Sequence, residues 1–195
     1  MKRLLSFLLA LFTAMAWGQT NHERRYELKP DPDWPLSIEL KSGDFEIVPS
    51  ASDCIAVVYQ LDGPEDQSRI EVQIASGHGQ NSLKIAGSKA NFHAVIEIPR
   101  KTNLKVRMTA GELHVGNVEG NKDIEMDAGN LELSQLRPQD YARADFSVRM
   151  GDVDAPMFKT VKAGLWRSFR TQGPGKYRLH AHIGFGDLTL RGSMI

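Results

Sequence analysis

The sequence contains a single cysteine, Cys54, so the chain cannot form an intramolecular disulfide. It also lacks an excess of either charge, with 24 Lys and Arg against 24 Asp and Glu. A strongly basic nucleic-acid-binding protein is thereby excluded, because such proteins hold phosphates with clustered Lys and Arg. The chain has no Gly-x-Ser-x-Gly, phosphate-loop, Cys-x-x-Cys or His-Glu-x-x-His motif. We therefore predict no catalytic residue, no metal ligand and no cofactor.

Long hydrophobic runs are absent except at the N-terminus. There, Lys2 and Arg3 precede an apolar run over residues 4–15, and small residues follow it. This pattern predicts a secretory signal peptide over residues 1–18; the alternative is an uncleaved membrane anchor, which needs about 20 apolar residues. Cleavage would leave 177 residues with a net charge of −2 and no membrane span. The absence of an Asn-x-Ser/Thr sequon favours a bacterial protein, exported to the periplasm or the extracellular space.

The rest of the chain has little helical periodicity and much strand periodicity. Segments such as 36–40, 70–74 and 104–108 alternate apolar and polar residues, which places one apolar face against a core. Gly and Pro separate these segments at short intervals. The sequence therefore predicts an all-β fold, with residues 19–35, which are rich in proline, as an extended lead-in.

One pattern recurs five times: glycine, an acid or amide, an apolar residue, any residue, and usually a second apolar residue. The later copies begin 18, 22 and 35 residues apart, and a spacing near 20 suits one coil of a β-solenoid. Glycine permits a positive φ at a corner, and the neighbouring Asp or Asn can bond backbone amides there. The predicted structural turn residues are Gly43, Asp44, Gly111, Gly129, Asn130, Gly151, Asp152, Gly186 and Asp187.

These copies predict a β-solenoid or β-helix-like stack, in which each coil lies on the one before it. Most strands before residue 106 lack the glycine pattern, so they are predicted to form an N-terminal β-sandwich-like cap over an otherwise exposed end. A single domain would span residues 36–195, with the cap-like part over 36–105 and the repeat coils over 106–195. The alternative is a β-sandwich whose hairpins use Gly-Asp turns.

The chain resembles a provisionally named adhesin family of bacteria, a domain of unknown function with a β-solenoid core. The resemblance rests on the signal peptide and on the segments 42–47, 110–113, 128–133 and 186–188, and it covers nearly the whole mature chain. It implies a binding role at the cell surface or in the periplasm. It implies no catalytic residues.

Residues 162–178 combine aromatic and basic side chains, the usual composition of binding hot spots. We predict an interaction surface there, with an envelope protein or polysaccharide as partner. The alternative is an enlarged coil in which Trp166 and Phe169 fill the core. The predicted surface residues are Trp166, Arg167, Phe169, Arg170 and Tyr177.

Two histidines share one face of a predicted strand. His180 and His182 are separated by one residue, so both side chains leave the same side of the backbone. Such a pair can hold zinc if a third ligand approaches, and His114 is one candidate. The alternative is a pair of solvated histidines.

Outward acids of the repeat offer a second interpretation of function. Glycoside hydrolysis needs two carboxylates about 5–10 Å apart, and Glu112, Glu132 and Asp154 occupy related outward positions. The sequence nevertheless favours an exported, non-enzymatic binding or scaffolding protein of the cell envelope. A periplasmic carbohydrate-active enzyme is the alternative.

Overall fold

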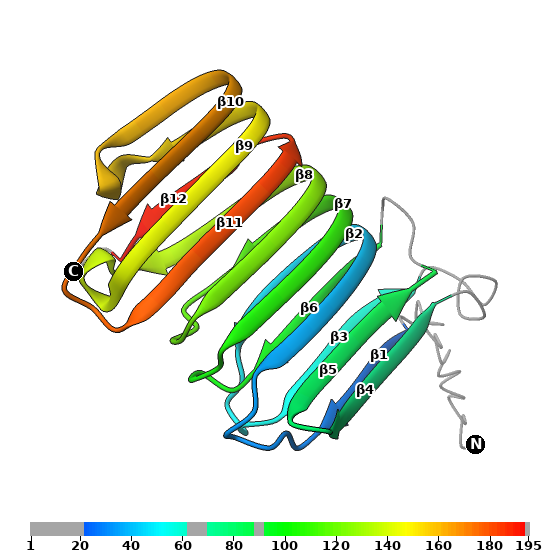
Figure 1. Ribbon diagram of the computed structural model, residues 1–195. Coiled ribbons are helices and arrows are strands. Elements are labelled where there is room, and N and C mark those ends of the chain that lie inside the picture. The colour runs from blue at the N-terminus through cyan, green and yellow to red at the C-terminus, as the bar shows by residue number, and fades with distance from the viewer. Residues whose placement is uncertain (1–21, 62–69, 88–91, 194–195) are drawn as a thin grey trace, which may run out of the picture.

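The computed structural model describes residues 22–61, 70–87 and 92–193, and it confirms the all-β prediction (Figure 1). The described chain contains no α-helix, and neither of its two 3-10 turns is long enough to cross a membrane. The predicted signal peptide lies outside the described residues. The strands are β1 (His22–Leu28), β2 (Leu36–Pro49), β3 (Ile55–Leu61), β4 (Glu71–Gly77), β5 (Gln80–Ala86), β6 (His93–Ile98), β7 (Leu104–Val115), β8 (Lys122–Leu136), β9 (Tyr141–Ala155), β10 (Thr160–Gln172), β11 (Tyr177–Phe185) and β12 (Leu188–Gly192), and the 3-10 turns are η1 (Pro138–Asp140) and η2 (Pro156–Phe158).

Five of the strands are long, and all of these except β10 carry a repeat glycine with positive φ near the middle. β2, β7, β8 and β9 span 12 to 15 residues. The first half of β2 pairs with β5 and its second half with β6, so the strand belongs to two faces. Side chains from both halves alternate into one core, which is why the period-two pattern is visible on either side of the glycine.

The repeat glycines lie side by side in a single column. Gly43, Gly111 and Gly129 occupy the same level of the parallel strands β2, β7 and β8. β11 and β12 then lie between β8 and β9 and pair in parallel with both, which puts Gly186 between Gly129 and Gly151 (Figure 1). The fifth copy of the repeat therefore does not follow the fourth in the sheet order. Instead, the chain returns after β10, and β11 and β12 occupy the space between β8 and β9.

The N-terminal strands pair differently. β3 is antiparallel to both β6 and β1, and β4 forms an antiparallel hairpin with β5. β1 lies within the predicted lead-in and ends before the first proline of that segment. It is the last strand at this end of the sheet order, and its sequence shows no apolar alternation because residues 23–27 are exposed.

The C-terminal end is closed by β10, which is antiparallel to β9 along its whole length. Residues 162–178 are thus a return strand and its connection to β11, not an enlarged coil. Three aromatic rings pack together at this end. Phe169 of β10 stacks on Phe146, with 6.1 Å between the ring centroids, and the centroid of Phe158 lies 5.4 Å from that of Phe146.

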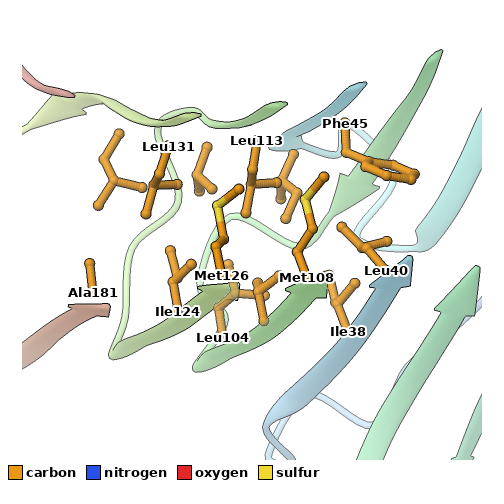
Figure 2. Close-up of a cluster of buried hydrophobic side chains, with 14 of the residues drawn as sticks. Ile38, Leu40, Phe45, Leu104, Met108, Leu113, Ile124, Met126, Leu131 and Ala181 are labelled. Carbon is orange, nitrogen blue, oxygen red and sulfur yellow. The ribbon is translucent and has the colours of Figure 1, made fainter. Parts of the chain in front are cut away.

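The core is built from rows of side chains that repeat from strand to strand. Ile38, Ile124 and Ala181 belong to one such row, and Leu40, Met108 and Met126 to the next (Figure 2). None of these side chains is more than 3% exposed. Each buried aliphatic side chain stabilises the fold by about 1.5–3 kcal/mol, and neighbouring strands bury one another's faces.

Candidate functional site

Four large apolar side chains lie exposed together at the C-terminal end of the stack. Their exposed fractions are 50% for Phe185, 49% for Met150, 57% for Leu165 and 75% for Trp166. Phe185 is in register with Met150, and Met150 is in register with Leu165. We call these four residues, with Arg149, the Trp166 patch.

The register explains why the patch occurs at this end. The position next to the repeat glycine carries Ser42, Ala110 and Ala128 on β2, β7 and β8. The same row continues into Phe185 on β11 and Met150 on β9. The residue at this position therefore has a small side chain on β2, β7 and β8 and a large apolar side chain on β11 and β9.

Trp166 is held in an unusual backbone conformation. Its φ is +53°, in the left-handed region that a bulky residue rarely adopts. Its ring lies under the guanidinium of Arg149, with 5.6 Å between the guanidinium carbon and the ring centroid. Strain of this kind persists only where the surrounding structure imposes it, and it is often found at binding sites. The ring is thus exposed, and its one described side-chain contact is with Arg149.

Arg167 supports the patch from the inner side of β10. It is paired with the buried Val148 and is itself half-buried. Its Nε is buried and has no hydrogen-bond partner in the described part of the chain, and its guanidinium lies against Gly164. The Arg167 guanidinium therefore lies beside Gly164, and Trp166 precedes Arg167 in the sequence.

The other three predicted surface residues lie elsewhere. Phe169 belongs to the aromatic core described above. Arg170 is ion-paired with Asp145, which also pairs with Arg143. Tyr177 is half-buried, with its ring 6.5 Å from that of Tyr141, beyond the far end of β10. The structure therefore brings Trp166 and Arg167 together and separates them from Phe169, Arg170 and Tyr177.

The acid and amide residues of the repeat link neighbouring layers. The Asn130 side-chain oxygen accepts a hydrogen bond from the Asp187 backbone N–H at 3.4 Å. The Asp187 carboxylate in turn accepts one from the Asp152 backbone N–H at 2.9 Å. These bonds connect Asp187, which immediately precedes β12, to β8 on one side and to β9 on the other. This is the part of the sheet in which a strand from late in the chain lies between two earlier ones. Asp44 contributes to the lining of an open depression, and Asn130 and Asp187 also line it.

That depression contains two of the acids considered for glycoside chemistry. It has a volume of about 520 Å³, and Asp44, Glu112 and Glu132 contribute to its lining. Asp154 lies one strand further on and is ion-paired with Arg191 at 3.0 Å. The carboxylates stand in rows on an exposed strand face rather than on two walls that enclose a substrate.

The paired histidines are on the outer surface, as the alternation indicates. His182 is hydrogen-bonded through Nδ1 to the Ser147 hydroxyl at 2.8 Å. Burial lowers the pKa of His182, and the charges of Arg149 and His180 lower it further. His114 bonds Ser134 instead, on the other half of the bent strands, so it is not a third ligand for this pair.

Sequence reasoning missed Phe185, Met150, Leu165 and Arg149. The signal was present, because Phe185 and Met150 immediately precede repeat glycines where the first three copies have Ser or Ala. The repeat pattern begins at the glycine and does not include the residue before it. The pattern therefore did not identify Phe185 and Met150 as surface residues.

Comparison with solved structures identifies a crystal structure from Clostridium sporogenes that is provisionally named a cell adhesion protein. It has a TM-score of 0.58 and 12% sequence identity, and the match covers 88% of this chain and 99% of that one. A provisionally named adhesin from Bacteroides fragilis has a TM-score of 0.33 and 11% identity over 86% of this chain and 96% of that one. The first comparison shows a shared fold. No family model and no curated protein matches the sequence.

Proposed function

We propose that the protein is an exported, adhesin-like binding protein of the bacterial cell envelope, and that it holds its partner at the Trp166 patch. The exposed row Phe185–Met150–Leu165, with Trp166 beside it, is the observation that carries the proposal. The provisional name of the Clostridium sporogenes structure agrees with a binding role. No enzymatic activity is part of the proposal.

The fold is proposed to be a short β-solenoid of the adhesin-like family, within one domain over residues 36–195. The in-register parallel pairing of β2, β7, β8, β11 and β9 supports the solenoid. A single buried cluster that extends from Leu36 to Leu190 supports one domain. The antiparallel strands β3 to β6, which lie within residues 36–105, would serve as the cap.

The composition of the patch favours a protein partner over a polysaccharide. Sugar-binding surfaces combine aromatic rings with many hydrogen-bonding groups, whereas Phe, Met, Trp and Arg are enriched at the centres of protein interfaces. The guanidinium of Arg149 over the Trp166 ring favours a partner surface that is apolar with acidic side chains at its border. Trp166 would be the central anchor, since its rigid ring loses little conformational freedom on binding.

The experiment compares the mature chain with a double variant, Met150→Ser with Trp166→Ala. Both are immobilised and exposed to the solubilised envelope fraction of the source organism and, separately, to its purified cell-wall polysaccharide. The retained protein is identified by mass spectrometry and its affinity is then measured with the purified partner. We expect a loss of affinity of at least about tenfold in the double variant, as for a hot-spot pair.

The matched control is Tyr26→Ala, which removes an exposed ring from β1 at the opposite end of the stack. It should retain the partner, and circular dichroism should confirm that all three proteins are folded. Equal retention by the double variant would overturn the assignment of the patch, and retention of polysaccharide alone would overturn the protein partner.

Export has its own test. The chain is expressed with its own N-terminus, cells are fractionated, and the mature N-terminus is sequenced. We expect cleavage after residue 16 or 18 and recovery outside the cytoplasm. Recovery of the intact N-terminus in the cytoplasm would contradict export.

A further inference from the structure

A second group of polar side chains lies on the outer surface of β8 and β11. In their parallel register, Asp123 is opposite His180 and Glu125 is opposite His182. A carboxylate oxygen of Asp123, a carboxylate oxygen of Glu125 and a ring nitrogen of His180 all lie within 4.8 Å of one another. Three groups that bind metals thus converge from two adjacent strands.

The backbone that carries these groups is firmly held. Ile124 lies between the two acids, and Leu179 and Ala181 lie on either side of His180, and none of these three is more than 1% exposed. β8 and β11 are also interior strands, with further strands paired on both sides. Only side-chain rotation is therefore needed to bring the three ligand atoms to the separation of about 3–3.5 Å that a tetrahedral zinc ion imposes.

Neighbouring charges leave two of the three groups available. Asp145 lies on the other side of His180, but it is ion-paired with both Arg143 and Arg170. Asp123 and His180 make no hydrogen bond or ion pair with any residue that the structure describes. Both side chains are therefore available as ligands.

Glu125 is the third group, and it is ion-paired with Arg107 of β7. A metal ion would have to compete with this guanidinium. Exposed pairs of this kind are worth about 0–1 kcal/mol, so Arg107 would weaken metal binding by a modest factor and would not prevent it.

We propose that Asp123, Glu125 and His180 form a site for a divalent transition-metal ion of the zinc class. One imidazole with two carboxylates suits borderline ions such as Zn²⁺ and Co²⁺, whereas Ca²⁺ requires six or more oxygens. Three protein ligands leave at least one coordination position for water or for a side chain of another molecule. This site is independent of the Trp166 patch.

The test is titration of the untagged, metal-free mature protein with Zn²⁺, followed by calorimetry, and with Co²⁺, followed by its visible absorption. We expect one ion per chain. His180→Ala and Asp123→Asn should each weaken binding at least about tenfold, because each removes a ligand. Arg107→Gln should strengthen it by up to about fivefold, as expected for loss of an exposed competing pair.

The matched control is His182→Ala, on the same strand and the same face two residues away. It should bind within about threefold of the unaltered chain, because His182 is not among the three converging groups and its Nδ1 is engaged by Ser147. The altered side chains are on the surface, so thermal unfolding should report folded protein in every case. Absence of stoichiometric binding would overturn the site, as would equal affinity in His180→Ala or a tenfold loss in His182→Ala.

Discussion

The carbonyl oxygen of Gly111 occupies the space into which a side chain at position 129 would project. Gly129 has φ of +117°, and it stands at the same level as Gly111 on the adjacent strand. The same relation recurs between Gly129 and Gly186 and between Gly186 and Gly151. The glycine column is thus a line of close backbone contacts, and the bend of each strand depends on the absence of a Cβ in its neighbour.

Gly129→Ala should therefore destabilise the protein strongly. The new Cβ meets a backbone atom that cannot move without shifting β7, and alanine also disfavours the positive φ. We expect the free energy of unfolding in urea to fall by about 2–4 kcal/mol. Gly77→Ala is the control, since no atom lies within 4 Å of its added Cβ, and it should change stability by less than about 0.5 kcal/mol. Similar losses in the two variants would contradict the steric role of the column.

Lys122 predicts a specific dependence of stability on pH. Its side chain is 2% exposed, and Nζ donates to the Val118 carbonyl at 2.6 Å and to the Tyr141 hydroxyl at 2.9 Å. Burial lowers the pKa of Lys122 to about 8, and the charges of Asp140 and Glu119 oppose this shift. Between pH 8 and the unfolded value near 10.5, the unfolded chain binds the proton more tightly. Stability from this group is therefore complete above the unfolded pKa and is lost as pH falls through about 8.

The measurement is urea unfolding of the unaltered chain and of Lys122→Met at several values from pH 8 to pH 10. Stability of the unaltered chain should rise relative to the variant by about 2 kcal/mol across this range, because a single proton is linked to unfolding. Burial also raises the pKa of Tyr141, so ionisation of this tyrosine in the unfolded chain lowers the stability of both proteins above pH 10. Parallel curves for the two proteins would show that folding does not lower the pKa of Lys122.

Local pattern was sufficient to predict the strands but not their order. Val106 and Met108, for example, are separated by an outward residue, and both are buried as the alternation requires. Nothing in that alternation predicts that β11 lies between β8 and β9, because these strands all present similar apolar rows to the core. β1 was missed for a different reason: it is an edge strand whose residues are mostly exposed, so its sequence has no apolar period.

The same limit applies to the candidate sites. His180 and His182 were recognised as a pair on one face, but the proposed ligand Asp123 lies far earlier in the chain and becomes a neighbour only through the insertion of β11. Trp166 was selected for its composition, whereas Phe185 and Met150 join it only once those strands lie side by side. Contacts between distant segments depend on layer order, which a repeated local pattern leaves undetermined.

Asn81 should hold the proline-rich turn before β2. It is 2% exposed, and its amide nitrogen donates to the carbonyls of Asp31 and Trp34 at 2.9 and 3.1 Å. Its side-chain oxygen accepts from the Asp31 N–H and the Ser76 hydroxyl. We expect Asn81→Ala to lower stability by about 2 kcal/mol or more, since several buried polar groups lose their partners.

Limited proteolysis distinguishes a local role from a general one for Asn81. In Asn81→Ala, cleavage between residues 30 and 35 should become faster while the rest of the chain stays protected. Asn81→Asp keeps the two accepted bonds and loses the two donated ones, so its loss of stability should be comparable. An unchanged cleavage rate in both variants would show that Asn81 does not hold the proline-rich turn before β2.

The backbone of Trp166 provides the last prediction. In an ordinary strand position, alanine is more stable than glycine because glycine loses more conformational freedom on folding. At φ of +53° the order should be reversed, since alanine incurs the left-handed penalty and glycine does not. We expect Trp166→Gly to be more stable than Trp166→Ala by about 1 kcal/mol in urea unfolding. Both variants lose the ring, so the contact with Arg149 cancels from the comparison. Ser168, two residues along β10 and not among the residues with positive φ, should show the ordinary order, with Ser168→Ala more stable than Ser168→Gly. If Trp166→Ala were also the more stable of its pair, the backbone of Trp166 would not be strained.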